Sequence, residues 1–237
     1  AARLAEMVED GVDAEVLFPT PRLSNAIIAH KDVDYHTTMI QAYNDWIIDE
    51  WCAGDGAGRL IPLTILPLWD VDLAVEEIRR CADLGSHAIA FSENPYPLGL
   101  PSIHSGKWDP VFAACEETES VVCMHIGSSS KMPQTTPDAP FIVSSTLTFQ
   151  NAMGSMIDFV FSGTLERFPN LVIAYSEGQV GWMPYVMERM DKLWEERVDN
   201  SFGSGLKNPP TSYLEGRMYG CIFDDETGLE ARDRIGM

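Results

Sequence analysis

The amino-acid sequence predicts an α/β protein whose parallel strands form a barrel of the (β/α)8 type. Six apolar segments of strand length alternate with helical segments, no glycine-rich nucleotide motif follows any of them, and polar residues gather where these segments end. Parallel strands need crossover connections, which the intervening helices supply. A parallel sheet covered by helices is therefore the expected architecture.

The predicted strands are short apolar runs that stop at proline, glycine or polar residues. They are expected at residues 14–20, 59–69, 87–94, 121–125, 170–178 and 217–225. The predicted helices have apolar residues three or four positions apart. They are expected at residues 32–54, 70–85, 108–120, 146–168, 181–198 and from 226 onward. No change in composition divides the chain, so residues 1–237 are expected to form a single domain.

Aspartates at the helix starts are candidate N-caps, because their carboxylates accept hydrogen bonds from the free backbone N–H groups there. Asp70 or Asp72 is expected to cap the helix over residues 70–85. Asp109 is expected to cap the helix over residues 108–120.

The composition restricts the partners and the location of the protein. With 36 acidic and 16 basic residues, the formal charge of −20 repels phosphate backbones and anionic membrane surfaces, so nucleic acid and membranes are not expected partners. No apolar run reaches about 18 residues, and no signal peptide is visible. The five cysteines form no C-x-x-C pair, which is typical of reduced thiols in a cytoplasmic protein. The chain begins inside a helical pattern, so a segment upstream of Ala1 is expected.

Six strand–helix units fit either an open doubly wound sheet or most of a closed barrel. Neither G-x-G-x-x-G nor G-x-x-x-x-G-K follows a strand, which favours the barrel. In a barrel the residues that follow the strands converge on one mouth, where such enzymes place their active sites. Those residues are Thr20, Arg22, Trp69, Asp70, Glu93, Asn94, His125, Ser176, Glu177, Asp224 and Asp225.

His125 is the leading candidate for a metal ligand. It ends the apolar strand in VVCMHIGSSS, where a neutral imidazole offers one nitrogen lone pair while a hydrogen bond fixes the other nitrogen. The alternative is a histidine that is only hydrogen-bonded in the rim. No second His or Cys lies within two to five residues, which argues against an isolated structural metal site.

Three segments carry a resemblance to a known family: VVCMHIGSS, FPNLVIAYSEGQVGWMPYVMERMD and MYGCIFDDETGLEARDRIG. Their order and spacing resemble the amidohydrolase-related family of the amidohydrolase superfamily, which includes aminocarboxymuconate semialdehyde decarboxylase and the resorcylate decarboxylases. The resemblance implies a distorted TIM-barrel-like fold, a homodimer and one divalent metal ion, commonly zinc, with manganese or iron as alternatives. The implied ligands are a pair of residues on strand 1, a histidine on strand 5 and an aspartate on strand 8.

In the strand order of that family, the first strand of this chain corresponds to strand 2 and the strand that ends at His125 corresponds to strand 5. The resemblance therefore implies that His125 is the strand-5 ligand. No His-x-His or Glu-x-His occurs in the sequence, so the strand-1 ligands are expected before Ala1 and the strand-8 aspartate after Met237. The expected barrel is thus incomplete, with strands 2 to 7 present and strands 1 and 8 missing.

Strand 6 of the family usually carries a histidine, and counting from Leu171 places Glu177 at that position. A carboxylate there either ligates the metal or accepts a proton from a metal-activated water. The alternatives are a surface glutamate or an N-cap. With glutamate in place of histidine, hydrolysis fits at least as well as decarboxylation.

The expected function is a metal-dependent hydrolase of a small cyclic or aromatic carboxylate-type compound, acting through an activated water. The alternatives are a non-oxidative decarboxylase of the same family and a non-catalytic scaffold. The expected substrate contacts are a carboxylate clamp from Arg22, an aromatic wall from Trp69, and polar groups of Asn94, Ser176 and Asp224. Asp224 is alternatively a helix cap. The loop over residues 130–146 is expected to serve as a lid or an interface.

Overall fold

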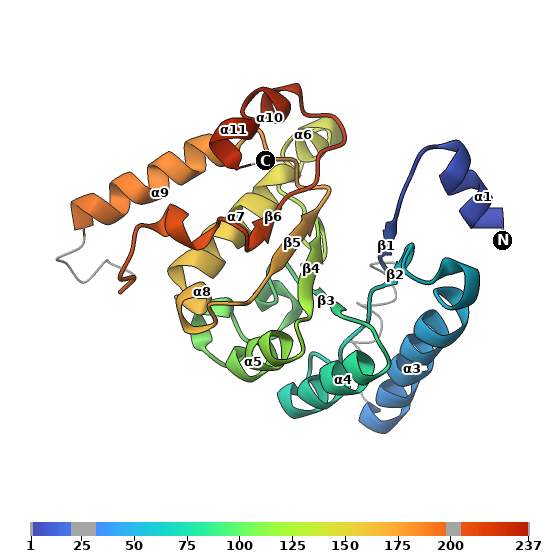
Figure 1. Cartoon of the computed structure of the whole chain (residues 1–237). Helices are drawn as coiled ribbons and strands as arrows, with labels where there is room; N and C mark the ends of the chain where they lie inside the picture. Colours follow the sequence, from blue (N-terminus) through green and yellow to red (C-terminus); the bar gives the residue numbers. More distant parts are fainter. Residues whose placement is uncertain (1, 20–31, 198–204, 237) are drawn as a thin grey trace.

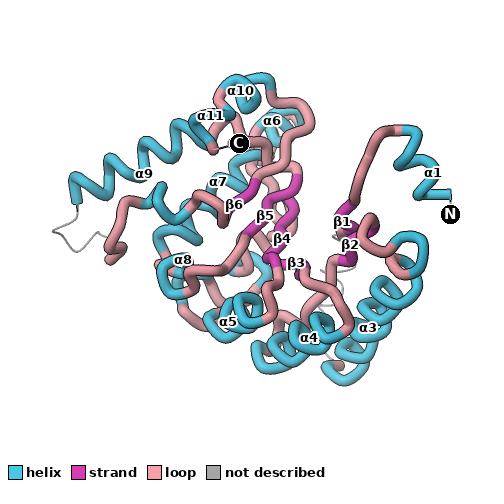
Figure 2. Tube along the Cα trace, viewed as in Figure 1, coloured by secondary structure: helices cyan, strands magenta, loops and turns pink. Residues whose placement is uncertain are grey.

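The structure is a computed structural model, and it describes residues 2–19, 32–197 and 205–236. Parallel strands and surrounding helices make up these segments (Figures 1 and 2). The strands are β1 (Glu15–Leu17), β2 (Leu60–Pro62), β3 (Ala88–Phe91), β4 (Val121–His125), β5 (Ile173–Ser176) and β6 (Met218–Tyr219). Each lies within a predicted strand, and all except β4 are shorter than predicted.

The strands lie side by side in chain order. β1 pairs with β2, and β3, β4, β5 and β6 form a second sheet, with all pairs parallel. A bridge between Thr64 and Ile89 joins the two sheets through the bonds Thr64 N–Ala88 O (3.0 Å) and Ala90 N–Thr64 O (2.7 Å). A doubly wound sheet reverses its strand order at a switch point. This layer has no reversal among its described strands, which is the order of a barrel wall.

The helices connect successive strands as predicted. They are α1 (Ala2–Glu9), α3 (Val33–Trp46), α4 (Val71–Asp83), α5 (Asp109–Glu117), α6 (Phe141–Thr146), α7 (Phe149–Phe161), α8 (Thr164–Arg167), α9 (Met183–Arg197), α10 (Glu226–Glu230) and α11 (Arg232–Ile235). A π-helix (Ile47–Trp51) extends α3, and 3-10 turns lie at Gly54–Gly56, Tyr96–Leu98, Ile103–Ser105 and Pro210–Tyr213. No helix of the described segments is both long enough and apolar enough to cross a membrane.

Two predicted details of the helices are wrong. The helix expected over residues 146–168 is divided into α7 and α8 because Gly163 between them has a left-handed φ of +73°. Asp109 does not cap α5 but is its first residue, and Trp108 occupies the cap position. The Asp109 carboxylate instead receives two 2.9 Å hydrogen bonds from Arg167, a bidentate pair stronger than a neutral capping bond. The prediction that Asp70 caps α4 is confirmed by its bonds from the N–H groups of Asp72 and Leu73.

The two faces of the strand layer carry side chains of different size. The outer face carries large side chains that pack in the main core: Ile89, Phe91, Val122, Met124, Ile173 and Tyr175. The other face of β3, β4 and β5 carries smaller side chains, which belong to a separate cluster together with Leu63, Ile61 and Phe18: Ala88, Ala90, Val121, Cys123 and Ala174. This second face is called the inner face. Because side chains alternate along a strand, His125 lies on it together with Cys123.

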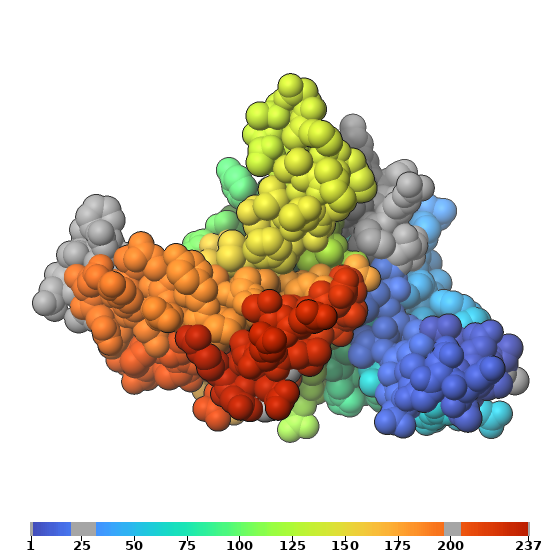
Figure 3. Space-filling view, turned by 90° about the horizontal axis from the view of Figure 1, so that it is seen from above, coloured from blue at the N-terminus to red at the C-terminus, as the bar shows by residue number. Residues whose placement is uncertain are grey.

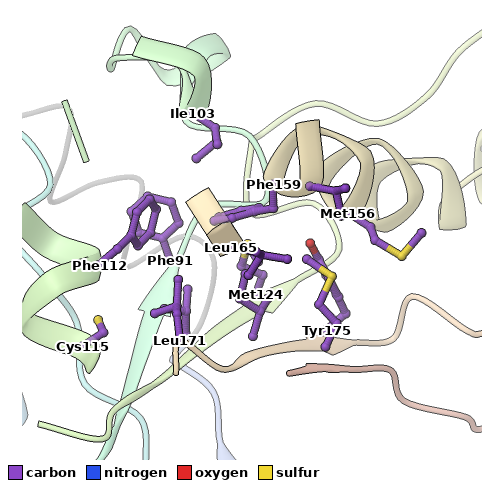
Figure 4. Close-up of a cluster of buried hydrophobic side chains, with 14 of the residues drawn as sticks. Phe91, Ile103, Phe112, Cys115, Met124, Met156, Phe159, Leu165, Leu171 and Tyr175 are labelled. Carbon is purple, nitrogen blue, oxygen red and sulfur yellow. The ribbon is translucent and has the colours of Figure 1, made fainter. Parts of the chain in front are cut away.

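The outer core fixes the layer against α5, α7 and α8. Figure 4 shows Phe112 of α5 beside Phe91 of β3, with Phe159 of α7 and Leu165 of α8 in the same cluster. Phe112 is fully buried and makes edge contacts with Phe91 and Phe159, with ring centroids 5.7 and 5.5 Å apart. Such contacts add to the stabilisation from apolar burial, so packing against these helices holds the strands in place.

The segment over residues 130–146 is not a plain loop, because it ends in α6. Seen from above, the yellow-green segment around α6 projects from the rest of the molecule (Figure 3). Phe141 and Ile142, the first two residues of α6, are 83% and 70% exposed. Its use as a lid or an interface stays a prediction.

Candidate active site

His125 lies at the carboxyl end of β4, at the inner face of the layer. It pairs in register with Ser176 of β5, and the N–H group of Ile126 donates to the Ser176 carbonyl at 3.3 Å. The ring of Phe18, which follows β1, meets the imidazole edge-on at 5.5 Å between centroids. The imidazole is thus held between β5 and the residues after β1, with 27% of its side chain exposed.

The two ring nitrogens of His125 have different partners. Nδ1 lies 2.8 Å from the carbonyl oxygen of Ile126. A carbonyl only accepts hydrogen bonds, so Nδ1 carries the proton, and Nε2 of the neutral ring presents its lone pair. Nε2 lies 3.4 Å from Oε1 of Glu177, so the second ring nitrogen faces a carboxylate oxygen.

This pair of atoms fits a divalent metal ion. The distance of 3.4 Å exceeds the length of a charge-assisted hydrogen bond, about 2.7 to 2.9 Å. Two neighbouring ligands of a tetrahedral zinc ion, each at a bond length of about 2.1 Å, are about 3.4 Å apart. No group of three His, Cys, Asp or Glu side chains able to hold a metal occurs among residues 2–19, 32–197 and 205–236. His125 and Glu177 are therefore two candidate ligands, fewer than the three that such a group requires.

Glu177 follows β5 in a conformation that glutamate rarely adopts. Its φ is +60°, Gln179 has a φ of +54°, and Ser130 after β4 has a φ of +56°. Each left-handed residue other than glycine costs about 1 to 2 kcal/mol, and such strain collects at functional sites. Two of these three residues flank Gly178, where an added Cβ would lie 2.6 Å from the Cβ of Ala152 on α7. The loop thus packs closely against α7 at Gly178, and this contact restricts the backbone of the neighbouring Glu177.

Asp225, the N-cap of α10 after β6, anchors the same loop. Its Oδ2 accepts hydrogen bonds from the N–H groups of Val180 (2.7 Å) and Gly181 (2.6 Å), while Oδ1 accepts from Gly228 (2.8 Å). These three N–H groups outweigh the effect of burial and hold the pKa of Asp225 below its ordinary value. The β5 loop that carries Glu177 and the β6 loop are therefore joined by one carboxylate.

Glu93 is a buried carboxylate beside this site. It follows β3, is 2% exposed, and its Oε1 accepts from the Gly127 N–H (2.9 Å), the Ser129 hydroxyl (2.9 Å) and the Asn151 amide (2.7 Å). Its Oε2 is buried without a hydrogen-bond partner among the described residues. Burial raises the pKa of Glu93, although the three donors oppose this shift.

Glu93 and Asn94 both follow a predicted strand, but the predicted substrate contact is Asn94 and not Glu93. Asn94 is exposed, and its Oδ1 accepts from the Tyr96 N–H (3.1 Å) in a local turn. A signal was present in the sequence, because Glu93 ends an apolar strand and the next strand ends in the donor-rich GSSS. That pairing of an acid with nearby donors indicates a buried, hydrogen-bonded carboxylate.

The structure brings together some of the other predicted residues. Ser176 lies opposite His125 and directly precedes Glu177. Trp69 is half-buried and packs edge-on to His36 of α3, and its Nε1 is buried without a hydrogen-bond partner among the described residues. Arg22 lies outside the described residues.

Asp224 does not have the alternative role of a helix cap. It is exposed and lies beyond β6, which ends at Tyr219. The cap of α10 is Asp225, because the Asp225 carboxylate, and not that of Asp224, reaches the N–H of Gly228. The carboxylate of Asp224 as a substrate contact stays a prediction.

Parallel strands in chain order, with an imidazole and a carboxylate at their carboxyl ends, define a barrel protein of the kind that places its active site at that end. The family follows from the sequence as a whole. A profile of the amidohydrolase family matches residues 1–230, and the chain belongs to this family, within a superfamily of enzymes. The predicted family is thereby confirmed.

Solved structures have the same fold. An amidohydrolase from Mycobacterium avium subsp. paratuberculosis K-10 is 20% identical with a TM-score of 0.79, and the match covers 99% of this chain and 61% of that chain. 5-Carboxyvanillate decarboxylase from Sphingomonas paucimobilis is 19% identical with a TM-score of 0.72, covering 100% of this chain and 69% of that chain. Dihydroxybenzoic acid decarboxylase from Polaromonas sp. JS666, with bound manganese and the inhibitor 2-nitroresorcinol, is 18% identical with a TM-score of 0.72, covering 99% and 71%.

The chain spans 61% of the length of the first of these structures, so it corresponds to a part of that protein. A comparison with curated proteins found no match.

Proposed function

We propose that this chain forms part of the active site of a metal-dependent hydrolase that acts on a small cyclic or aromatic carboxylate-type compound. His125 and Glu177 are the proposed ligands of one divalent ion. The observation that carries the proposal is that His125 Nε2 faces Glu177 Oε1 at 3.4 Å, at the carboxyl ends of adjacent strands.

The residues around this pair suit hydrolysis. A divalent ion at such a site lowers the pKa of a water molecule and polarises a carbonyl group. In the alternative role of general base, Glu177, with half of its side chain exposed, would take up the proton of the attacking water. The Trp69 Nε1–H, which has no hydrogen-bond partner in the described part of the chain, suits an oxygen atom of the substrate, and Ser176 and Asn94 are further proposed contacts. Arg22 is proposed to hold the substrate carboxylate.

The proposed metal is zinc, with manganese or iron as alternatives. A nitrogen and a carboxylate oxygen are acceptable ligands for all three, and manganese is bound in the similar dihydroxybenzoic acid decarboxylase. We infer that the remaining ligands come from strands outside residues 1–237, as in a barrel of which this chain supplies strands 2 to 7.

Decarboxylation is the second candidate reaction, because two of the similar structures are decarboxylases of aromatic acids. In that case Glu177, in its protonated form, would deliver a proton to the ring carbon that loses carbon dioxide. A scaffold that binds no metal is the third reading.

Metal analysis tests the proposal directly. The full-length protein, with the strands proposed to supply the remaining ligands, is compared with its His125→Ala and His104→Ala variants. His104→Ala is a matched control, because its exposed imidazole binds Asp158 of α7 at 3.0 Å. We expect His125→Ala to lose bound metal and His104→Ala to keep it. Equal metal content in all three proteins would remove His125 from the ligands, and a metal-free wild type would favour the scaffold.

The reaction is then assigned by turnover of the metal-loaded protein. Hydrolysis of esters, lactones or amides supports the first candidate, whereas release of carbon dioxide from aromatic acids supports the second.

A further inference from the structure

One peptide unit connects Glu93 to His125. The peptide between Ile126 and Gly127 has its N–H end bonded to Oε1 of Glu93 at 2.9 Å. Its carbonyl end accepts from Nδ1 of His125 at 2.8 Å. The two contacts thus belong to opposite ends of one planar group.

The geometry of the peptide bond makes this connection rigid. The described peptides are all trans, and in a trans peptide the N–H and C=O bonds point in opposite directions within one plane. A rotation of this plane would move both ends at once. The orientation of the carbonyl that holds the imidazole therefore depends on the carboxylate that holds the N–H.

We propose that Glu93 is a positioning residue for His125, which acts through the Ile126–Gly127 peptide to fix the tautomer and the direction of the imidazole. This inference rests on the proposed function, in which Nε2 of His125 binds the metal. Glu93 itself does not touch the substrate in this proposal, because it is 2% exposed and bonded to Asn151 of α7.

Further contacts hold Glu93 and the β4 loop together. The Ser128 hydroxyl accepts from the Glu93 backbone N–H at 2.9 Å, and the Ser129 hydroxyl donates to the Glu93 carboxylate at 2.9 Å. Gly127 has a φ of +82°, so this loop takes a turn that needs glycine and an external support. Glu93 is anchored on its other side by the Asn151 amide at 2.7 Å, so the support comes from the helix layer.

The charge of Glu93 also has a chemical effect on the imidazole. A carboxylate that accepts from a peptide N–H polarises that peptide and strengthens the carbonyl as an acceptor. The stronger bond to Nδ1–H favours the tautomer with a free Nε2 and raises the basicity of this nitrogen toward a metal. The arrangement resembles a carboxylate–histidine pair with one peptide inserted between the two groups.

The test compares Glu93→Gln, which keeps the shape and removes the charge, with Ser129→Ala, which removes a different bond to the same carboxylate. Nitrogen NMR of the metal-free full chain at about pH 9, above the ordinary imidazole pKa of about 6.5, reports the tautomer of His125. We expect the Nδ1–H tautomer in the wild type and in Ser129→Ala, and a mixture of tautomers in Glu93→Gln. An unchanged tautomer in Glu93→Gln, or an equal change in Ser129→Ala, would overturn the proposal.

Metal affinity provides a second readout, measured by competition with a chelator for zinc and for manganese. The dissociation constant is expected to rise about tenfold in Glu93→Gln, in the range found for groups that orient metal ligands, and to stay unchanged in Ser129→Ala. A tenfold rise in both variants would indicate a general loosening of the loop and would also count against Glu93.

A measurement on the unmodified protein covers the case in which Glu93→Gln does not fold. An N–H that donates to a buried carboxylate is strongly deshielded, so the Gly127 amide proton is expected at unusually low field. An ordinary shift would contradict the proposal. Absence of metal from the wild type would defeat the proposed function, whereas the tautomer and the Gly127 shift would still decide the role of Glu93.

Discussion

Charged side chains have different partners at the two ends of the strand layer. At the amino ends, Arg79 and Glu117 form an ion pair at 2.7 Å, while Glu116 accepts from the Asn170 N–H at 2.6 Å and Arg217 donates to the carbonyls of Leu165 and Phe168 at 2.7 and 2.6 Å. At the carboxyl ends, Glu93 and Glu177 have no lysine or arginine partner among the described residues. The Glu177 carboxylate, without a lysine or arginine partner, therefore lies where a cation is proposed to bind.

The backbone differs in the same way. Ser130, Glu177 and Gln179 have left-handed conformations in the loops after β4 and β5, whereas Glu119 is the one such non-glycine residue described before a strand. This difference agrees with the proposed function, in which the chemistry takes place at the carboxyl ends of the strands, as it does in barrel enzymes generally. Two substitutions and one pH dependence test this difference between the two ends, from the largest expected effect to the smallest.

Replacement of Glu177 by glycine should separate activity from stability. Loss of the carboxylate is expected to lower turnover by about 10²- to 10⁴-fold, the usual contribution of a general base. The free energy of unfolding should stay equal or rise by up to about 1 kcal/mol, because glycine tolerates the φ of +60°. Turnover and denaturant unfolding of the metal-loaded protein measure the two quantities.

Glu119→Gly is the matched control, since Glu119 has a φ of +54° in the turn before β4. It should show the same response in stability and no loss of turnover. A similar loss of turnover in both variants would contradict the division between the two ends.

Replacement of Asp225 by alanine should loosen the β5 loop. Three backbone N–H groups lose a charged acceptor, so the free energy of unfolding is expected to fall by about 2 kcal/mol or more. Asp224→Ala is the control, and it should change stability by less than about 0.5 kcal/mol because its side chain is exposed. Equal effects in denaturant unfolding would show that Asp225 does not anchor the loop.

The pH dependence of stability should have opposite signs at the two ends. Hydrogen bonds from the Lys207 ammonium and backbone N–H and from the Tyr213 hydroxyl lower the pKa of Glu166, in α8, from 4.5 to about 2. Its contribution to stability is therefore present above pH 4.5 and is lost as the pH falls toward 2. Burial raises the pKa of Glu93 above 4.5, so its contribution is present below pH 4.5 and is lost as the pH rises through the folded-state value.

Unfolding curves of the wild type, Glu166→Gln and Glu93→Gln across the acid range measure these contributions. The advantage of the wild type over Glu166→Gln should shrink on acidification, and its advantage over Glu93→Gln should shrink as the pH rises. A common direction for the two variants would refute the assignment of one paired and one desolvated carboxylate.

The sequence predicted the order of the elements because burial of apolar runs decides where strands and helices form. It did not predict where each strand ends, because backbone pairing sets that limit. The run over residues 59–69 yields only Leu60–Pro62, since its prolines lack the N–H group that a ladder requires.

The meeting of His125 and Glu177 was predictable, because each follows one of two adjacent parallel strands. The role of Glu93 was not, since its partners Gly127, Ser129 and Asn151 lie 34 to 58 positions away in the sequence. The shift of the α10 cap from Asp224 to Asp225 likewise depends on a distant loop, because Asp225 also serves Val180 and Gly181.

Among the described residues, the two sheets are joined at one backbone bridge, between Thr64 and Ile89. On one side of it stand β1 and β2, with Phe18 against the imidazole, and on the other stand the four strands that carry His125 and Glu177. Separation along this line would draw the phenyl ring away from the imidazole while leaving both proposed ligands in place. The position of Phe18 against the imidazole therefore depends on this bridge, whereas the positions of His125 and Glu177 relative to each other do not.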